Sequence, residues 1–166
     1  ETDVMKDKPE MVIGFGDTNS PLAGALAAVK VHIPVAHVEA GLRSFDRTMP
    51  EEINRVVVDH VSDLLFCPTE TAIRNLSSEG ITKSVHLVGD VMVDALEYSR
   101  GIAEKKSKVL EQFGLHQKGY LVVTVHRPAN TDNRENMESI LSALGDSGFP
   151  VLFPVHPRTK KMLREY

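Results

Sequence analysis

The sequence predicts an α/β fold built on parallel β-sheets, and three observations lead to this prediction. From residue 11 onward, short apolar runs alternate with segments of helical periodicity. Capping and stop signals lie at the ends of several helical segments. Polar residues gather directly after the apolar runs, where parallel sheets bind ligands. Such alternation is typical of a parallel sheet that helices cover on both faces.

Six apolar runs are expected to be strands, namely residues 11–15, 34–38, 64–67, 85–88, 120–125 and 151–155. Residues 1–10 look like the end of a helix that leads into the first strand. Ser20 is expected to cap the first complete helix, with Pro21 in its first turn.

The next helices have equally clear signals. Residues 51–62 carry apolar side chains at helical spacing. Thr69 begins a helix that should run to Glu79, with Gly80 as its stop. Asp90 caps another, which is expected to end before Gly101. Four strand–helix units are therefore complete by residue 100.

The composition then changes. Residues 101–118 are rich in charge and contain one short helix at 109–113, which suits a crossover between domains. Two more strand–helix units follow in residues 119–166. Two strands and two helices cannot bury both faces of a parallel sheet, so we expect a fold that is truncated at both ends.

Composition narrows the functional classes. The 166 residues are 42% hydrophobic, which is enough for a core, and the formal net charge is −4. No basic stripe suits nucleic acid, and no apolar run approaches the ~20 residues that span a bilayer, so we expect neither as a partner. Cys67 is the single cysteine and is expected to be a buried thiol, which fits a cytoplasmic location.

Four polar residues follow predicted strands: Asp17, Glu39, His126 and His156. Each alone has a structural explanation, since Asp often bonds backbone N–H groups in turns and a histidine at a strand end is often only hydrogen-bonded. We expect all four on one rim of the sheet, and their coincidence there favours a functional site.

Glu51 has a strong structural alternative. Thr48, two residues and Glu51 fit a capping box, in which the Glu bonds back to the N-cap backbone. Arg43, Arg47 and Arg55 surround this segment and could pair with carboxylates or with a phosphate.

Several classes of site are disfavoured. The seven histidines show no H-x-x-x-H or Cys/His ligand spacing, so we expect no metal. The sequence has neither a G-x-S-x-G elbow nor a Walker A motif, which argues against a serine hydrolase and against an NTPase.

Several motifs together closely resemble the non-hydrolysing UDP-N-acetylglucosamine 2-epimerases. They are Gly16-Asp17-Thr18, the segments 33–43, 50–55 and 68–70, Val88-Gly89-Asp90 and Val125-His126-Arg127. The resemblance implies a two-domain fold of the glycosyltransferase-B type with UDP between Rossmann-like halves. Residues 1–100 would be later units of the first half, 101–118 the interdomain crossover and 119–166 the start of the second half.

The resemblance also implies a reaction and its residues. UDP-GlcNAc and UDP-ManNAc would interconvert by elimination and re-addition of UDP, without a cofactor, for cell-surface polysaccharide synthesis. The catalytic residues would be Asp17, Glu39, Glu51 and His126, and the substrate-binding residues Arg43, Arg55, Arg127 and His156. We expect a homodimer, with a second UDP-GlcNAc as an effector. The alternatives are a glycosyltransferase-B type sugar transferase and a non-catalytic nucleotide-sugar-binding fragment.

Overall fold

The computed structural model describes residues 2–165, without the side chains of residues 3–5. The first predicted segment begins at Glu1 and the last ends at Tyr166, and these two residues lie outside the described part of the chain. The chain divides into two compact units, Glu1–Arg100 and Gly101–Tyr166. No helix in the described part combines the length and the apolar character needed to cross a bilayer.

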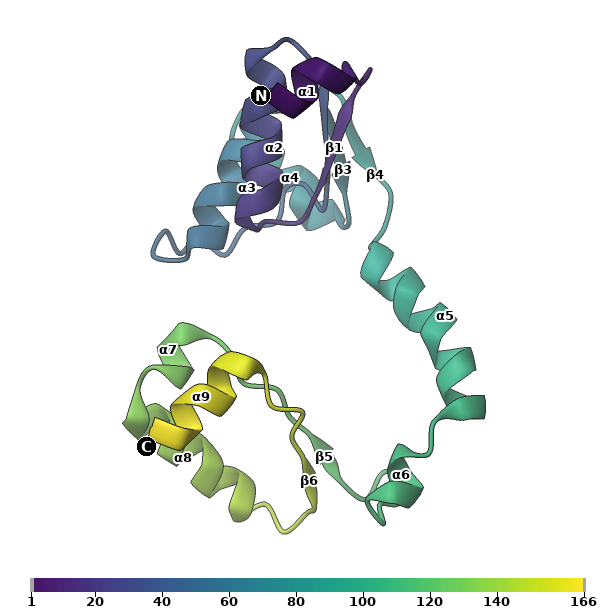
Figure 1. The fold of residues 1–166 in the computed structure, drawn as a ribbon, viewed down its shortest axis with the longest axis vertical. Coiled ribbons are helices and arrows are strands. Elements are labelled where there is room, and N and C mark those ends of the chain that lie inside the picture. The colour runs from purple at the N-terminus through teal and green to yellow at the C-terminus, as the bar shows by residue number, and fades with distance from the viewer. Residues whose placement is uncertain (1, 166) are drawn as a thin grey trace. The chain divides into compact units, whose positions relative to one another are not determined.

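The first unit contains a four-stranded parallel sheet (Figure 1). Its strands are β1 (Val12–Phe15), β2 (Val35–Val38), β3 (Leu64–Cys67) and β4 (Val85–Leu87). They lie in the order β1-β2-β3-β4, so each strand pairs with its neighbour in sequence. The first four predicted strands are confirmed to within one residue at each end. The short helix α1 (Thr2–Asp7) precedes β1.

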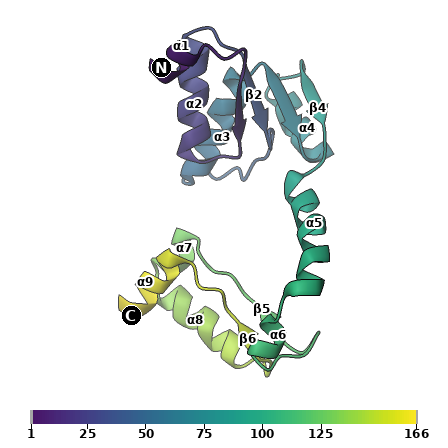
Figure 2. The ribbon, with the colours of Figure 1, turned by 45° about the vertical axis from the view of Figure 1, so that its right-hand side comes forward.

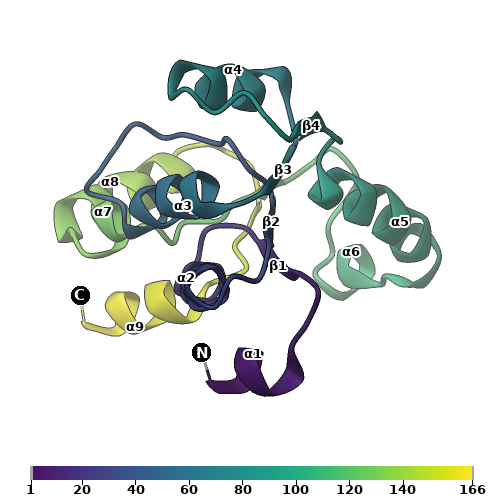
Figure 3. The ribbon, with the colours of Figure 1, turned by 90° about the horizontal axis from the view of Figure 1, so that it is seen from above.

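Three helices cover one side of this sheet (Figure 3): α2 (Asn19–Lys30), α3 (Pro50–Val61) and α4 (Glu70–Ser78). Right-handed connections between strands in sequential order place every crossover helix on the same side. The buried core lies between these helices and the sheet. One cluster joins Val35 to Val58 of α3, and a second joins Leu65 and Cys67 to Leu76 of α4.

The expectation that helices cover both faces of the sheet is wrong for the first unit. Side chains that alternate with the buried ones point to the opposite face, where Ile13 is 55% exposed and Phe15 is 61% exposed. The ring of Phe66 lies on the same face and contacts His86, with ring centroids 5.8 Å apart. The sequential strand order is the reason, because it sends all three crossover helices to one side.

Two predicted caps are confirmed. The Thr69 hydroxyl accepts the Ala72 N–H at 3.2 Å at the start of α4, and the Asp90 carboxylate accepts the Met92 N–H at 2.8 Å. Gly80 follows α4 with a φ of +83°, a conformation that favours glycine.

Two predicted helix boundaries are wrong. The N-cap of α2 is Thr18 rather than Ser20, and Thr18 makes no side-chain capping bond. The helix after Asp90, α5 (Val91–Lys106), continues through Gly101. A single glycine inside a helix costs only about 1 kcal/mol, which the surrounding turns outweigh here.

The second unit holds a two-stranded parallel sheet of β5 (Leu121–Val122) and β6 (Val151–Leu152) (Figure 2). Its helices are α6 (Val109–Gln112), α7 (Pro128–Thr131), α8 (Arg134–Gly145) and α9 (Pro157–Glu165). The short helix predicted at 109–113 is therefore confirmed. The predicted strands at 120–125 and 151–155 are too long, since only two residues of each are assigned to a strand.

Candidate active site

The turn after β1 carries Asp17 and is fixed by α3. Gly16 has a φ of +70°, which lets the chain turn sharply, and its N–H donates to the Val38 carbonyl at 3.1 Å. The Asn54 amide of α3 donates to the Asp17 carbonyl at 2.9 Å and to the Asn19 side chain at 3.0 Å. The backbone around Asp17 is thus held from two sides.

The side chain of Asp17 is ion-paired yet accessible. The Arg55 guanidinium donates to the Asp17 carboxylate, which remains 33% exposed. Arg55 also donates to Glu52 at 3.2 Å, while its buried Nε–H has no hydrogen-bond partner among the described residues. Arg55 therefore sets a positive charge beside Asp17 and keeps one donor unused.

Glu39 follows β2 in a conformation that is unusual for its type. Its φ is +71°, in the left-handed region, where a residue other than glycine is strained. A Cβ atom built on Gly16 would lie 3.6 Å from Oε2 of Glu39, so this carboxylate lies against the turn that carries Asp17. Backbone strain of this kind is concentrated at functional sites.

Glu51 lies in the first turn of α3 and is exposed. The predicted capping box is wrong, because the N-cap is Met49 and the Thr48 hydroxyl donates to Asp46 at 2.6 Å instead. Within residues 2–165 no hydrogen bond or ion pair of the Glu51 side chain is found. The structural explanation that competed with a catalytic role for Glu51 is therefore removed.

The adjacent Glu52 is structural, and the sequence analysis did not distinguish it from Glu51. Glu52 is 3% exposed and accepts the N–H groups of Ser44 and Phe45, both at 2.9 Å, and the Ser44 hydroxyl. Burial would raise the pKa of Glu52, but these hydrogen bonds and the charge of Arg55 outweigh burial and hold it below its ordinary value of 4.5. Glu52 thus anchors the loop after Arg43.

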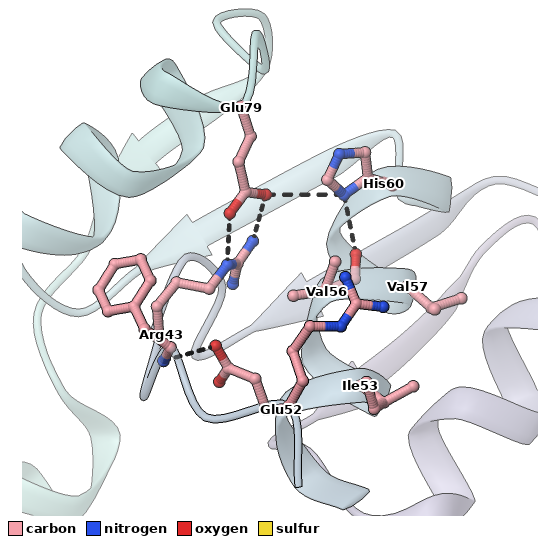
Figure 4. Close-up of a pocket in the computed structure, with 9 residues that line it drawn as sticks. Arg43, Glu52, Ile53, Val56, Val57, His60 and Glu79 are labelled. Carbon is pink, nitrogen blue, oxygen red and sulfur yellow. Dashed lines mark hydrogen bonds and ion pairs between the residues drawn. The ribbon is translucent and has the colours of Figure 1, made fainter. Parts of the chain in front are cut away.

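Arg43 makes its polar contacts within the protein. Its guanidinium donates to both carboxylate oxygens of Glu79 at 2.7 Å (Figure 4). It also donates to Asp59 at 2.7 Å, and its side chain is 1% exposed. Burial opposes the charge of Arg43, but Glu79 and Asp59 outweigh it and raise the pKa of Arg43 above its ordinary value. The bidentate pair joins the loop after β2 to the end of α4.

A pocket of about 390 Å³ lies beside this ion pair (Figure 4). Ile53, Val56 and Val57 of α3 form its apolar wall, and the residues that line it include none of the three candidate carboxylates. The polar groups of Arg43 and Glu79, which both line the pocket, are paired with each other. Of the predicted site residues, only Arg43 lines this pocket.

Two further buried residues connect the candidate carboxylates, and the sequence analysis missed both. His37 of β2 and Asp59 of α3 are each 1% exposed or less. The ring of His37 contacts Asp59 at 2.6 Å and the Gly16 carbonyl at 2.9 Å, and Asp59 accepts the Gly41 N–H at 3.0 Å. A histidine inside an apolar strand was the one sequence signal for this contact.

The predicted residues of the second unit lie in the segments that follow its two strands, which end at Val122 and Leu152. The rings of His126 and His156 have centroids 5.4 Å apart and are tilted by 36°. Arg127 precedes α7 and is exposed. The expectation of one common rim is wrong, because Asp17 and Glu39 follow strands of one sheet and the two histidines follow strands of another.

No metal site is evident in the part of the chain that the structure describes. Among those residues, His, Cys, Asp and Glu side chains do not gather in groups of three or more that could hold an ion. The buried His37 is committed to Asp59 and to the Gly16 carbonyl.

The sequence matches one family throughout. The model of a family described as UDP-N-acetylglucosamine 2-epimerase matches residues 1–166. A Methanococcus maripaludis protein named UDP-N-acetylglucosamine 2-epimerase homolog is 54% identical over 98% of this chain and 46% of its own length. A Pseudomonas aeruginosa protein named UDP-2,3-diacetamido-2,3-dideoxy-D-glucuronate 2-epimerase is 47% identical over 96% of this chain and 46% of its own length.

The solved structures that resemble this chain are from the same family. The crystal structure of Methanocaldococcus jannaschii UDP-GlcNAc 2-epimerase in complex with UDP-GlcNAc and UDP superposes with a TM-score of 0.89 at 47% identity, over 99% of this chain and 47% of that one. The Neisseria meningitidis UDP-GlcNAc 2-epimerase bound to UDP-GlcNAc gives 0.85 at 34% identity, over 99% and 48%. The chain thus spans about half the length of these relatives. The predicted fold class, parallel-sheet units of the glycosyltransferase-B type, is confirmed.

Proposed function

Because the chain belongs to the UDP-N-acetylglucosamine 2-epimerase family, we propose that a protein of the relatives' length that contains it interconverts UDP-GlcNAc and UDP-ManNAc. We call that protein the full-length protein. One observation of the structure carries the proposal. The turns that hold Asp17 and Glu39 adjoin, and a strained backbone at Glu39 presents its carboxylate against Gly16. Two carboxylates on adjoining turns at the carboxyl ends of parallel strands suit acid/base chemistry on one bound sugar.

The chemistry of the substrate explains why such groups are needed. No carbonyl activates the C2 proton of the sugar, so inversion is easiest through elimination. A base removes the C2 proton, the C2–H electrons form a C1=C2 double bond, and the C1–O bond electrons leave with UDP. In the return step a UDP oxygen bonds to C1 and a proton is delivered to the opposite face of C2. Acid/base groups beside the ring and cationic donors on the diphosphate lower these barriers.

The proposed roles follow the charges at the site. Asp17, Glu39 and Glu51 are assigned as the acid/base groups, and the accessible Asp17 and exposed Glu51 support this. Arg55, which forms an ion pair with the accessible Asp17, is assigned to the substrate.

The remaining predicted residues lie in the second unit or are buried in the first. His126 is assigned to catalysis near the diphosphate, and Arg127 and His156 are assigned to substrate binding; all three residues are exposed in the second unit. The buried contacts of Arg43 with Glu79 and Asp59 support a positioning role for Arg43 rather than contact with substrate.

A second substrate is worth testing because of the relatives' names. The Pseudomonas aeruginosa 2-epimerase named for a diacetamido glucuronate and the Methanocaldococcus jannaschii UDP-N-acetylglucosamine 2-epimerase are both 47% identical to this chain. Overall identity therefore does not choose between the two sugars. A cytoplasmic location, a homodimer, an effector UDP-GlcNAc and a role in cell-surface polysaccharide synthesis stay predictions.

The test is to incubate the full-length protein with UDP-GlcNAc in deuterated water and to follow C2 by proton NMR. Appearance of UDP-ManNAc with deuterium at C2 is the expected result. A parallel reaction with the diacetamido glucuronate nucleotide separates the two substrates. Transfer of the sugar to an acceptor would identify a transferase, and saturable UDP-GlcNAc binding without exchange would identify a non-catalytic binder. Either result would replace the epimerase proposal.

A further inference from the structure

The buried pair of His37 and Asp59 lies at the centre of the first unit's site. The His37 Nδ1 is 2.6 Å from Oδ1 of Asp59, and both side chains are 0% exposed. The other ring nitrogen, Nε2, is 2.9 Å from the carbonyl oxygen of Gly16. Oδ2 of Asp59 accepts the Gly41 N–H at 3.0 Å and the Arg43 guanidinium at 2.7 Å.

These contacts determine how the pair is protonated. A carbonyl oxygen only accepts hydrogen bonds, so Nε2 of His37 carries a proton. One more proton lies between Nδ1 and the Asp59 carboxylate. The N–H of Gly41 and the charge of Arg43 both stabilise the ionised form of Asp59, so that proton belongs to Nδ1. His37 is then a buried imidazolium that donates in two directions.

The charges around the pair are balanced. Arg43 pairs with both Asp59 and Glu79, and the Cys67 thiol, which neighbours Asp59, stays neutral because burial raises its pKa to about 11. Two cations, His37 and Arg43, thus face two carboxylates. A buried charge is tolerated only with such compensation.

The pair connects three segments that carry candidate catalytic groups. His37 bonds the carbonyl of Gly16, which directly precedes Asp17. Asp59 bonds the N–H of Gly41, two residues after Glu39. Asp59 itself belongs to α3, whose first turn carries Glu51.

We propose that His37 and Asp59 form a charged positioning pair that fixes Asp17, Glu39 and Glu51 relative to one another for the epimerase reaction. The proposal rests on the proposed function for its catalytic consequence. Neither residue touches the substrate. A displacement of about 1 Å at a catalytic group can lower a rate by ~10²-fold, so the pair is expected to affect turnover more than substrate binding.

Two variants separate the two hydrogen bonds of the His37 ring, one to Asp59 and one to the Gly16 carbonyl. In His37→Gln the amide nitrogen lies near the former Nε2 and retains the bond to the Gly16 carbonyl, while the bond to Asp59 is lost. In His37→Asn the shorter amide reaches Asp59 but not Gly16. Both variants remove the buried imidazolium, so their stabilities should fall to a similar extent. His86→Asn is a matched control, because His86 is exposed on the opposite face of the sheet.

The first measurement is made on the 166-residue chain and requires no activity. Nitrogen NMR of the His37 ring should show protons on both nitrogens, and an unprotonated Nδ1 would overturn the charged pair. In His37→Asn the amide signals of Asp17 and Thr18 should shift more than in His37→Gln, and the Gly41 amide should shift more in His37→Gln. An unchanged Asp17 turn in His37→Asn would overturn the positioning role.

The second measurement is the epimerisation rate of the full-length protein. We expect kcat of His37→Asn to fall by ~10²-fold with KM changed by less than about threefold, and kcat of His37→Gln to fall by less than about tenfold. Equal losses of kcat in the two variants would show a merely structural role. An inactive wild-type protein would contradict the proposed function instead, and the NMR measurement would still decide the pair.

Discussion

Arg55 forms an ion pair with Asp17, although 38 positions separate the two residues in sequence. The pair brings the first turns of α3 to the end of β1, where the chain makes its sharp turn at Gly16. The same guanidinium also bonds Glu52, so one arginine joins an accessible carboxylate to a buried one. The predictions below separate the roles of these carboxylates.

Replacement of Asp17 by Asn should lower the epimerisation rate of the full-length protein by ~10²-fold or more. Asn retains an acceptor for Arg55 but cannot take up or release a proton. The pair is partly exposed, so the free energy of unfolding should change little. The measurements are kcat by NMR exchange and stability by urea titration, with exposed Asp94→Asn as the control. A normal rate combined with lower stability would make Asp17 a turn residue only.

Substitution of Glu51 by Gln, and also by Ala, should abolish most activity and leave stability within about 0.5 kcal/mol of the wild type. Glu51 is exposed and has no capping role, because the N-cap of α3 is Met49. Thermal unfolding and the exchange assay give the two quantities. Loss of stability in the Ala variant alone would restore a capping explanation.

Glu52→Gln should lower stability at neutral pH and flatten its acid dependence. The pKa of Glu52 lies below its ordinary value of 4.5 in the folded chain, so its contribution is present above 4.5 and is lost as pH falls through the lower folded value. Urea titrations between neutral and acidic pH measure this. Exposed Glu70→Gln is the control. An identical pH dependence in Glu52→Gln and wild type would contradict the role of Glu52 as an ionised anchor.

The thiol of Cys67 should react slowly with a disulfide reagent at pH 8 in the folded chain. Burial, with a contribution from the Asp59 charge, raises the pKa of Cys67 to about 11, so thiolate is scarce compared with a free cysteine. We expect a rate roughly 10²-fold below that of the urea-unfolded chain, which serves as the control. The reaction is followed by the absorbance of the released reagent thiol. Equal rates in the folded and the unfolded chain would show that the Cys67 thiol is accessible in the folded chain.

The 166-residue polypeptide by itself is predicted not to turn over UDP-GlcNAc. The chain spans about half the length of its relatives, so any donor to the diphosphate that lies in their other half is not supplied by these residues, and loss of one such donor can cost ~3 kcal/mol of barrier. The exposed Ile13 and Phe15 should also favour self-association. Deuterium exchange at C2 and light scattering test the two statements. Deuterium entering C2 would show a complete site within these residues.

Local signals in the sequence predicted the framework of this fold well. The strand at Leu64–Cys67 and the cap at Thr69 depend on residues next to them, and both were predicted. Contacts that depend on how distant segments align in the fold were not predicted. His37 and Asp59 are 22 positions apart, and they meet only because β2 and α3 pack with one particular alignment. Glu51 and Glu52 differ by ~100° of helix rotation, which separates an exposed carboxylate from a buried one.

The strand order of the first unit has a consequence for the rate at which the chain folds. β2, β3 and β4 each pair with the strand that precedes them in the sequence. Pairing between sequence neighbours closes shorter loops than another order of these four strands would, and a lower contact order favours faster folding. The unit can therefore assemble one strand–helix step at a time as it leaves the ribosome. The bond from His37 to Asp59 joins β2 to α3 and includes no residue of β3 or β4.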